Sequence, residues 1–350
     1  MNIKFNAGWF YGGSIVLLSV WVLHSYLEPL LAACVTAIAS WPLYKRFAAR
    51  VLPRVGRSAT SLMFTLVMTA FVLAPLVFAF GALLTEAHAL ILEIAAADKK
   101  GIPVPQWLQN LPLIGPWVAA RWQHDFAHAG ALAVWTERAD PAALLATAQS
   151  LGHFMARHAF IVVFTILLLF FLYQDGEFLA SGFRRLLRHH IGERGDGYLD
   201  LATRAVRASV NSMLVVALFD GCASGVAYWF AGVPEAGVWA AITGLLALVP
   251  FLGYVAVILL ALKMALTDAA SLSLLTFGLG CALLLFGDKV IRPAAASGGI
   301  RLRFVWVLMG CLGGFEVLGL VGLVVGPVVL TLVRELWEQR IRALPAVEDA

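Results

Sequence analysis

Long apolar runs with almost no charges recur along this 350-residue chain and constrain its fold more than any other feature. Runs such as residues 58–84 and 208–231 reach the roughly 20 helical residues that cross the hydrocarbon core of a bilayer. Only helices and closed barrels satisfy their backbone groups in lipid, and these runs lack the alternation of barrel strands. The sequence therefore predicts an all-α, polytopic helical membrane protein.

The composition agrees with a membrane protein and argues against a soluble one. The chain is 61% hydrophobic and 13% charged, whereas soluble domains carry about 25% charged residues. The net charge of +4 does not indicate nucleic acid as a partner, because the cations cluster beside apolar runs, where they set orientation in a membrane. The four cysteines lie far apart within apolar segments, so neither disulfides nor a metal cluster is expected.

Charge and proline divide the chain into five segments. Residues 1–85 form N-terminal helices, broken at Glu28-Pro29 because proline disfavours a continuous helix. Residues 86–157 mix charges, prolines and tryptophans, which suits amphipathic helices at the outer interface. The remaining segments are a span with a basic cytoplasmic stretch (158–207), a transport core (208–335) and a cytoplasmic tail (336–350).

Clusters of cations predict the orientation in a bacterial inner membrane. Five cations and no acid lie between residues 45 and 57: Lys45, Arg46, Arg50, Arg54 and Arg57. A second arginine-rich stretch follows the span at 158–173. Placing both inside, as the positive-inside rule requires, puts the N- and C-termini in the cytoplasm.

The transport core holds two apolar segments that suit re-entrant helical hairpins better than straight spans. Residues 238–262 and 304–333 are interrupted by proline and glycine, and if each re-enters, every basic loop falls inside. Two span-plus-hairpin units in opposite orientations then result, the arrangement of many secondary transporters. The alternative for these residues is ordinary close helix packing. The residues expected to permit the breaks are Pro250, Gly253, Gly313, Gly314, Gly326 and Pro327.

Five short motifs resemble those of the autoinducer-2 exporter family, or PerM-type permeases. They are residues 105–108 with 111–115, 170–176 (Phe-Phe-Leu-Tyr-Gln-Asp-Gly), 249–253 (Val-Pro-Phe-Leu-Gly), 288–293 (Asp-Lys-Val-Ile-Arg-Pro) and 319–327. They occur in the family's order along almost the whole chain. The resemblance implies an inner-membrane transporter that forms homo-oligomers and carries out efflux or cation–proton exchange. Two residues depart from the family pattern: Gln174, where lysine is common, and Glu316, where a small or apolar residue is usual.

Ionisable residues inside the apolar segments are the candidates for transport chemistry, because burying them in lipid is costly. Asp220 lies mid-span, with Asn211 and Ser212 on the same helix, and suits an ion-coupling site; a structural hydrogen bond is the alternative. The second hairpin is expected to break at residues 313–316, which places Glu316 at its tip. An acid there suits cation binding or closing a gate, with a solvated tip as the alternative. Asp288 and Arg292 are four residues apart and suit a helical ion pair, as an interfacial anchor or as a gate latch.

The sequence thus predicts a permease for a small polar solute, with H⁺ or Na⁺ as coupling ion and the lipid bilayer as its environment. A membrane scaffold without transport activity is the alternative. No cofactor is expected, and no enzyme: phosphate-loop, Gly-x-Ser-x-Gly and His-Glu-x-x-His motifs are absent from the sequence. His124 and His128 have the spacing of metal ligands but no apparent third ligand, so no metal site is predicted.

Overall fold

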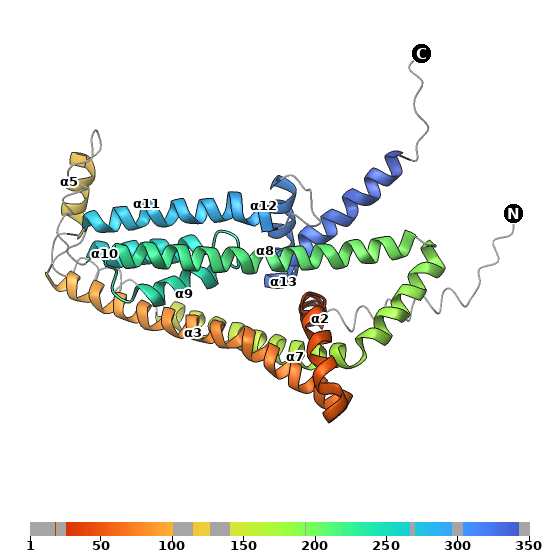
Figure 1. The fold of residues 1–350 in the computed structure, drawn as a ribbon. Helices are drawn as coiled ribbons and strands as arrows, with labels where there is room; N and C mark the ends of the chain where they lie inside the picture. The colour runs from red at the N-terminus through yellow and green to blue at the C-terminus, as the bar shows by residue number, and fades with distance from the viewer. Residues whose placement is uncertain are drawn as a thin grey trace, which may run out of the picture. The chain divides into compact units, whose positions relative to one another are not determined.

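The computed structural model describes Leu18 and residues 26–100, 115–126, 141–192, 194–266, 270–295 and 304–342. Every regular element in these ranges is a helix (Figure 1). The elements are α2 (Leu27–Val55), α3 (Arg57–Lys100), α5 (Gly115–Phe126), α7 (Pro141–Ile191), α8 (Arg194–Phe230), α9 (Ala236–Leu246), α10 (Gly253–Leu266), α11 (Ala270–Phe286), the π-helix η2 (Gly287–Ile291), α12 (Arg292–Ala295) and α13 (Phe304–Arg342). The all-α class is confirmed for this part of the chain.

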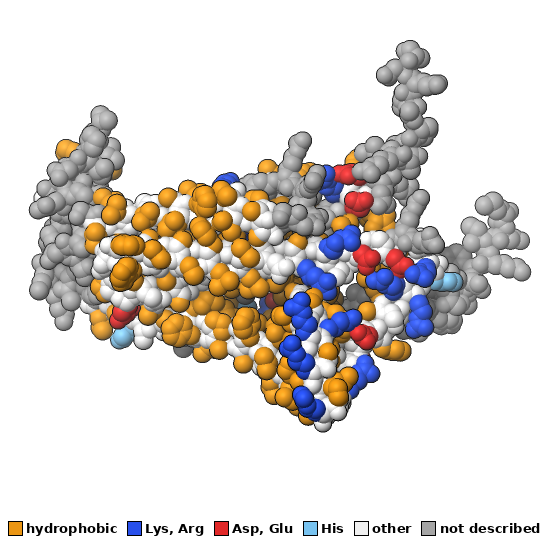
Figure 2. Space-filling model, viewed as in Figure 1, with side chains coloured by type: hydrophobic (Ala, Val, Ile, Leu, Met, Phe, Trp, Pro, Cys, Tyr) orange, Lys and Arg blue, Asp and Glu red, His pale blue; other side chains and the backbone are white. Residues whose placement is uncertain are grey.

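Five of the described helical segments are long and apolar enough to cross a membrane. Their outer faces are apolar as well, as the broad hydrophobic surface in Figure 2 shows. Phe71, Val77 and Leu218, for example, are each about two-thirds exposed, which suits contact with lipid rather than water. The five segments are Leu27–Val55, Arg57–Glu86, Gly152–Ile191, Gly195–Phe230 and Leu272–Ala295.

The chain divides into two compact units, each assembled from segments far apart in the sequence. Unit 1 comprises Met1–Val67, Phe154–Arg207 and Leu302–Ala350. Unit 2 comprises Met68–His153 and Ala208–Arg301. The five-segment division made from the sequence stays a prediction about membrane topology.

An aromatic and hydroxyl cluster holds the helices of unit 1 together. Tyr173 of α7 is 1% exposed, and its hydroxyl lies 2.6 Å from the Ser40 hydroxyl of α2. Tyr44 stacks on Tyr173 at 4.9 Å, and its hydroxyl lies 3.0 Å from that of Ser61 in α3. Buried hydroxyls that pair across helices satisfy each other where water is excluded. The family-like motif at 170–176 lies within α7, and the helix continues beyond it to Ile191.

In unit 1, α13 folds back on itself at Gly319, which has φ 58° and ψ −145°. A Cβ on Gly322 would overlap the carbonyl of Gly314, and one on Gly326 would overlap that of Gly310, so the two arms run antiparallel. The sequence analysis expected the break at 313–316, with Gly326 and Pro327 contributing. This position is corrected: those residues are helical, and Gly314 and Gly326 serve close packing between the arms instead.

Unit 2 contains the other broken segment, and here the expected break is observed. α9 ends at Leu246 and α10 begins at Gly253, so Pro250 lies in the intervening turn. The arms pack antiparallel, since Trp239 and Ile242 of α9 share a buried cluster with Leu260 and Met264 of α10. That these arms are re-entrant in a bilayer remains a proposal.

The region predicted to hold short interfacial helices is only partly so. α3 continues without a break from the apolar span through Lys100, rather than ending near residue 85. α5 is short, at 12 residues, and Trp117 on it is 73% exposed, as expected for an interfacial helix. The family-like motifs at 105–108 and 111–114 lie outside the described residues.

Candidate functional site

One face of α8 in unit 2 carries a stripe of buried polar side chains. Its members are three, eight, four and four residues apart, spacings that keep them on one side of a helix. They are Ser209, Ser212, Asp220, Ser224 and Tyr228, each no more than 8% exposed. The sequence analysis placed Asn211 beside this face as an alternative, but Asn211 is exposed. A polar stripe inside an apolar helix marks the side that faces protein rather than lipid.

Small residues let α9 approach α8 next to this stripe. A Cβ on Gly244 would lie 2.8 Å from the carbonyl oxygen of Ala217 and 2.9 Å from the Cα of Gly221. A Cβ on Gly225 would lie 2.7 Å from the Cβ of Ala240. The first arm of the broken segment is therefore pressed against the helix that carries Asp220.

Asp220 is the most unusual member of the stripe. It is 1% exposed, and its Oδ1 has no hydrogen-bond partner within the described part of the chain. The carboxylate lies against Gly287, where a Cβ would overlap Oδ1, so only glycine leaves room for it. A buried carboxylate without a donor is costly unless it takes up a proton or a cation.

A π-helical turn and an ion pair border Asp220. Gly287 begins η2, and π-helical turns occur often at functional sites. Arg292 donates from Nε and Nη2 to Asp288 Oδ1 at 3.1 and 2.9 Å, so the predicted i,i+4 pair is observed. Asp220 lies within electrostatic range of both groups. The guanidinium of Arg292 is therefore already engaged by Asp288.

The start of α10 also reaches this region. Tyr254 is half-buried and lies within electrostatic range of Asp220, Asp288 and Arg292. Gly253 packs closely on the neighbouring helix, since a Cβ there would lie 3.2 Å from Leu284 of α11. Asp220, the π-helical turn and the start of α10 thus lie together in unit 2.

The remaining predicted residues have separate positions. Ser212 donates a hydrogen bond to the carbonyl of Ser209 at 2.8 Å. Glu316 is an exposed helical residue of unit 1. Gly287 and Tyr254 were missed by the sequence analysis. Gly287 directly precedes the acidic motif at 288–293 and offered a signal, whereas a tyrosine at the start of an apolar helix is too common to offer one.

Unit 2 contains a second charged cluster that the sequence analysis did not identify. Glu86 is 7% exposed, and its Oε2 lies 2.5 Å from the Nζ of Lys263 on α10. That ammonium lies 5.9 Å from the ring centre of buried Trp239. Because exposed Glu235 shares a hydrogen bond with Glu86, the pKa of Glu235 lies above its ordinary value. This cluster ties α3 to the second arm of the broken segment.

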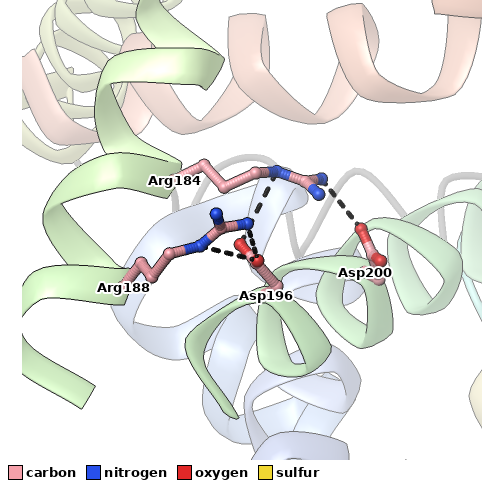
Figure 3. A network of polar contacts seen from close by, with 4 residues as sticks. All are labelled: Arg184, Arg188, Asp196 and Asp200. Carbon is pink, nitrogen blue, oxygen red and sulfur yellow. Dashed lines mark hydrogen bonds and ion pairs between the residues drawn. The ribbon is translucent and has the colours of Figure 1, made fainter. Parts of the chain in front are cut away.

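A network of ion pairs joins α7 to α8 in unit 1 (Figure 3). Arg184 donates to Asp200 at 3.0 Å, and Arg188 donates from Nε to Asp196 at 3.1 Å. Arg188 is in the last turn of α7 and Asp196 in the first turn of α8, the positions where each charge opposes its helix dipole. We assign this network to fixing the turn between the helices.

In the described residues no group of three or more His, Cys, Asp or Glu is positioned to hold a metal; His128 lies outside them.

Several apolar helices, a broken helical segment and a buried carboxylate with one oxygen lacking a donor among the described residues are typical of a polytopic membrane protein of the transporter class. The chain belongs to the AI-2E family of transporters, whose family model matches residues 14–342. This match confirms the family indicated by the sequence motifs.

Two bacterial relatives are similar along most of their length, and a third over about half of it. The chain is 27% identical over 344 residues to YdiK of Escherichia coli K12, covering 96% of this chain and 90% of that protein. It is 25% identical over 342 residues to a protein of Buchnera aphidicola subsp. Baizongia pistaciae, covering 95% and 89%. An Aquifex aeolicus protein is 28% identical over 177 residues, covering 50% and 48%. Their names give transport as an inferred activity and mention no substrate.

Proposed function

We propose that this chain is an ion-coupled carrier of a small polar solute in the bacterial inner membrane, and that Asp220 takes up the coupling proton or cation. The observation that carries the proposal is the buried carboxylate of Asp220, whose Oδ1 has no donor within the described residues. A structural aspartate would be expected to have such a donor. An acid that exchanges a proton or Na⁺ during a cycle needs a free oxygen.

The neighbouring groups support exchange rather than permanent binding. Arg292 already pairs with Asp288, so a proton or a monovalent cation that binds Asp220 need neutralise only its one carboxylate. Because residue 287 is glycine, the carboxylate of Asp220 touches the backbone of the π-helical turn. Such turns are short, and they occur often at functional sites. A change in occupancy at Asp220 can therefore shift this turn and the start of α10.

The proposed cycle uses the two broken segments as re-entrant hairpins that alternately expose the solute. The arms of the first segment are apolar and too short to cross a bilayer alone: α9 has 11 residues and α10 has 14, or about 17 and 21 Å, against a core of about 30 Å. Efflux is the direction we propose, and assembly into homo-oligomers is part of the same proposal. Glu316 is proposed as a second cation-binding carboxylate.

Proteoliposomes with a trapped pH dye test the role of Asp220. We expect an imposed inward Na⁺ gradient, or a solute from a polar-metabolite screen, to drive proton movement in the wild type. Asp220→Asn, which is close in shape but cannot ionise, should reduce that movement at least tenfold. The control is Asp175→Asn, which removes an exposed carboxylate of unit 1 paired with Arg57. Coupled flux that survives in Asp220→Asn would exclude Asp220 as the coupling group.

A further inference from the structure

The C-terminal half of α2 in unit 1 carries a row of arginines. Arg46, Arg50 and Arg54 are spaced four residues apart, so they recur on one side of the helix at intervals of about 6 Å. All three are exposed. In Figure 2 lysine and arginine side chains gather over α2 and the turn between α7 and α8.

The cations on either side of this row have acidic partners, whereas the three arginines have none among the described residues. Lys45 lies 3.4 Å from Glu177, and Arg57 lies 3.6 Å from Asp175. No acidic partner of Arg46, Arg50 or Arg54 is found among the residues that the structure describes; Arg54 donates instead to the carbonyl of Arg50 at 3.2 Å. Like charges held this close repel each other unless an anion lies between them.

The length of α2 brings the row to the level of lipid headgroups. The helix has 29 residues, or about 43 Å, and exceeds the hydrocarbon core of about 30 Å. Its apolar part, residues 27–44, accounts for about 27 Å of that length. The remaining turns therefore extend into the headgroup region, on the side where the cations are.

Exposed apolar side chains next to the row point to lipid rather than to an acidic protein. Leu43 is 54% exposed and Leu52 is 42% exposed on the same part of the helix. Leucines and arginines exposed together are typical of helices that lie partly in the acyl region and partly among headgroups. Guanidinium groups also bind phosphate oxygens in a two-pronged geometry that ammonium groups lack.

We propose that Arg46, Arg50 and Arg54 form a site on α2 that retains phospholipids with anionic headgroups, such as phosphatidylglycerol. The site is separate from Asp220 and does not depend on the transport mechanism. It also differs from a general orientation signal, because orientation needs only positive charge, whereas lipid retention depends on a row of cations without acidic partners among the described residues and is strongest for guanidinium groups.

Native mass spectrometry of the purified full-length chain, released from nanodiscs of mixed phosphatidylglycerol and phosphatidylcholine, tests the proposal. Wild type should retain phosphatidylglycerol in preference to phosphatidylcholine. Each arginine removed should weaken retention about fivefold, so Arg46→Gln/Arg50→Gln/Arg54→Gln should weaken it about a hundredfold. Replacing the same three by lysine should leave a weaker but measurable preference.

The matched control also removes three positive charges, but from cations that already have acidic partners: Lys45→Gln/Arg57→Gln/Arg334→Gln. Retention in the control should stay within about threefold of wild type. Equal loss in both triple variants would overturn the proposal, because net charge alone would then explain binding. So would equal retention of phosphatidylcholine, displacement of the lipid by millimolar inorganic phosphate, or binding of an acidic peptide in its place.

Discussion

At the scale of single residues, we expect unit 2 to be destabilised when only one member of the Glu86–Lys263 ion pair is removed. Glu86→Gln leaves a largely buried ammonium without its carboxylate. We expect this to destabilise the protein by about 3 kcal/mol, the lower end of the cost of breaking a buried pair. The measurement is unfolding in detergent micelles. Glu338→Gln, which breaks the more exposed Arg334–Glu338 pair, should cost at most about 1 kcal/mol.

The double variant Glu86→Gln/Lys263→Met separates charge from packing in this cluster. Removing both charges should recover most of the lost stability, because the buried ammonium that lost the Glu86 carboxylate is then gone. If Glu86→Gln is as stable as wild type, the pair does not hold α3 to α10.

Asp220 could be identified from the sequence, whereas Glu86 could not. An acid in the middle of an apolar run has no water to solvate it, so its position alone indicates a role. Glu86 ends its apolar run, where an acid is usually solvated at the interface, and its partner Lys263 is 177 positions away. No local pattern connects two residues at that separation.

At the scale of elements, the fold-back of α13 depends on Gly319. Its φ of 58° with ψ −145° is a conformation that side-chain-bearing residues avoid, and a Cβ there would lie 2.7 Å from the Oε1 of Glu28. Gly319→Ala should therefore destabilise the protein by about 1–3 kcal/mol and broaden its unfolding transition in detergent. Gly313→Ala is the control, because a Cβ on Gly313 meets nothing within 4 Å. Equal stability of the two variants would contradict the assignment of the break to Gly319.

The sequence located one break and misplaced the other for a physical reason. Pro250 cannot donate a backbone hydrogen bond, so it marks its own turn. In α13 six glycines occur between Gly310 and Gly326, and glycine serves a positive φ and close helix contact equally well. The structure distinguishes them: the chain turns at Gly319, whereas Gly314 and Gly322 lie where the two arms contact each other.

At the scale of the whole molecule, the sequence predicted apolar helical segments but not how they group. α3 changes unit after Val67 and α8 after Arg207, each without a break in the helix. A division of the chain at loops and charge clusters cannot detect this, because the helices are continuous where the grouping changes. The residues around Asp220 come together because α8, α10, η2 and α12 all belong to unit 2, although they lie up to 72 positions apart by numbering (220 to 292).

The membrane topology is the prediction that tests the whole arrangement. If both broken segments are re-entrant, the two ends of each hairpin lie on one side of the membrane, and the two hairpins open to opposite sides. Single cysteines at Pro234 and Ala265 bracket the first hairpin, and single cysteines at Val305 and Leu336 bracket the second. They are introduced after Cys34, Cys222, Cys281 and Cys311 have been replaced by serine or alanine.

A membrane-impermeant maleimide applied to intact spheroplasts and to inverted vesicles gives the sides. We expect Pro234→Cys and Ala265→Cys to react from outside only, and Val305→Cys and Leu336→Cys from the cytoplasmic side only. The antiparallel packing of Gly310 on Gly326 and of Trp239 beside Met264 requires the two ends of each hairpin to lie close together. If the members of a pair react from opposite sides, that segment crosses the bilayer, and the alternating hairpins proposed for transport must be abandoned even though the family assignment stands.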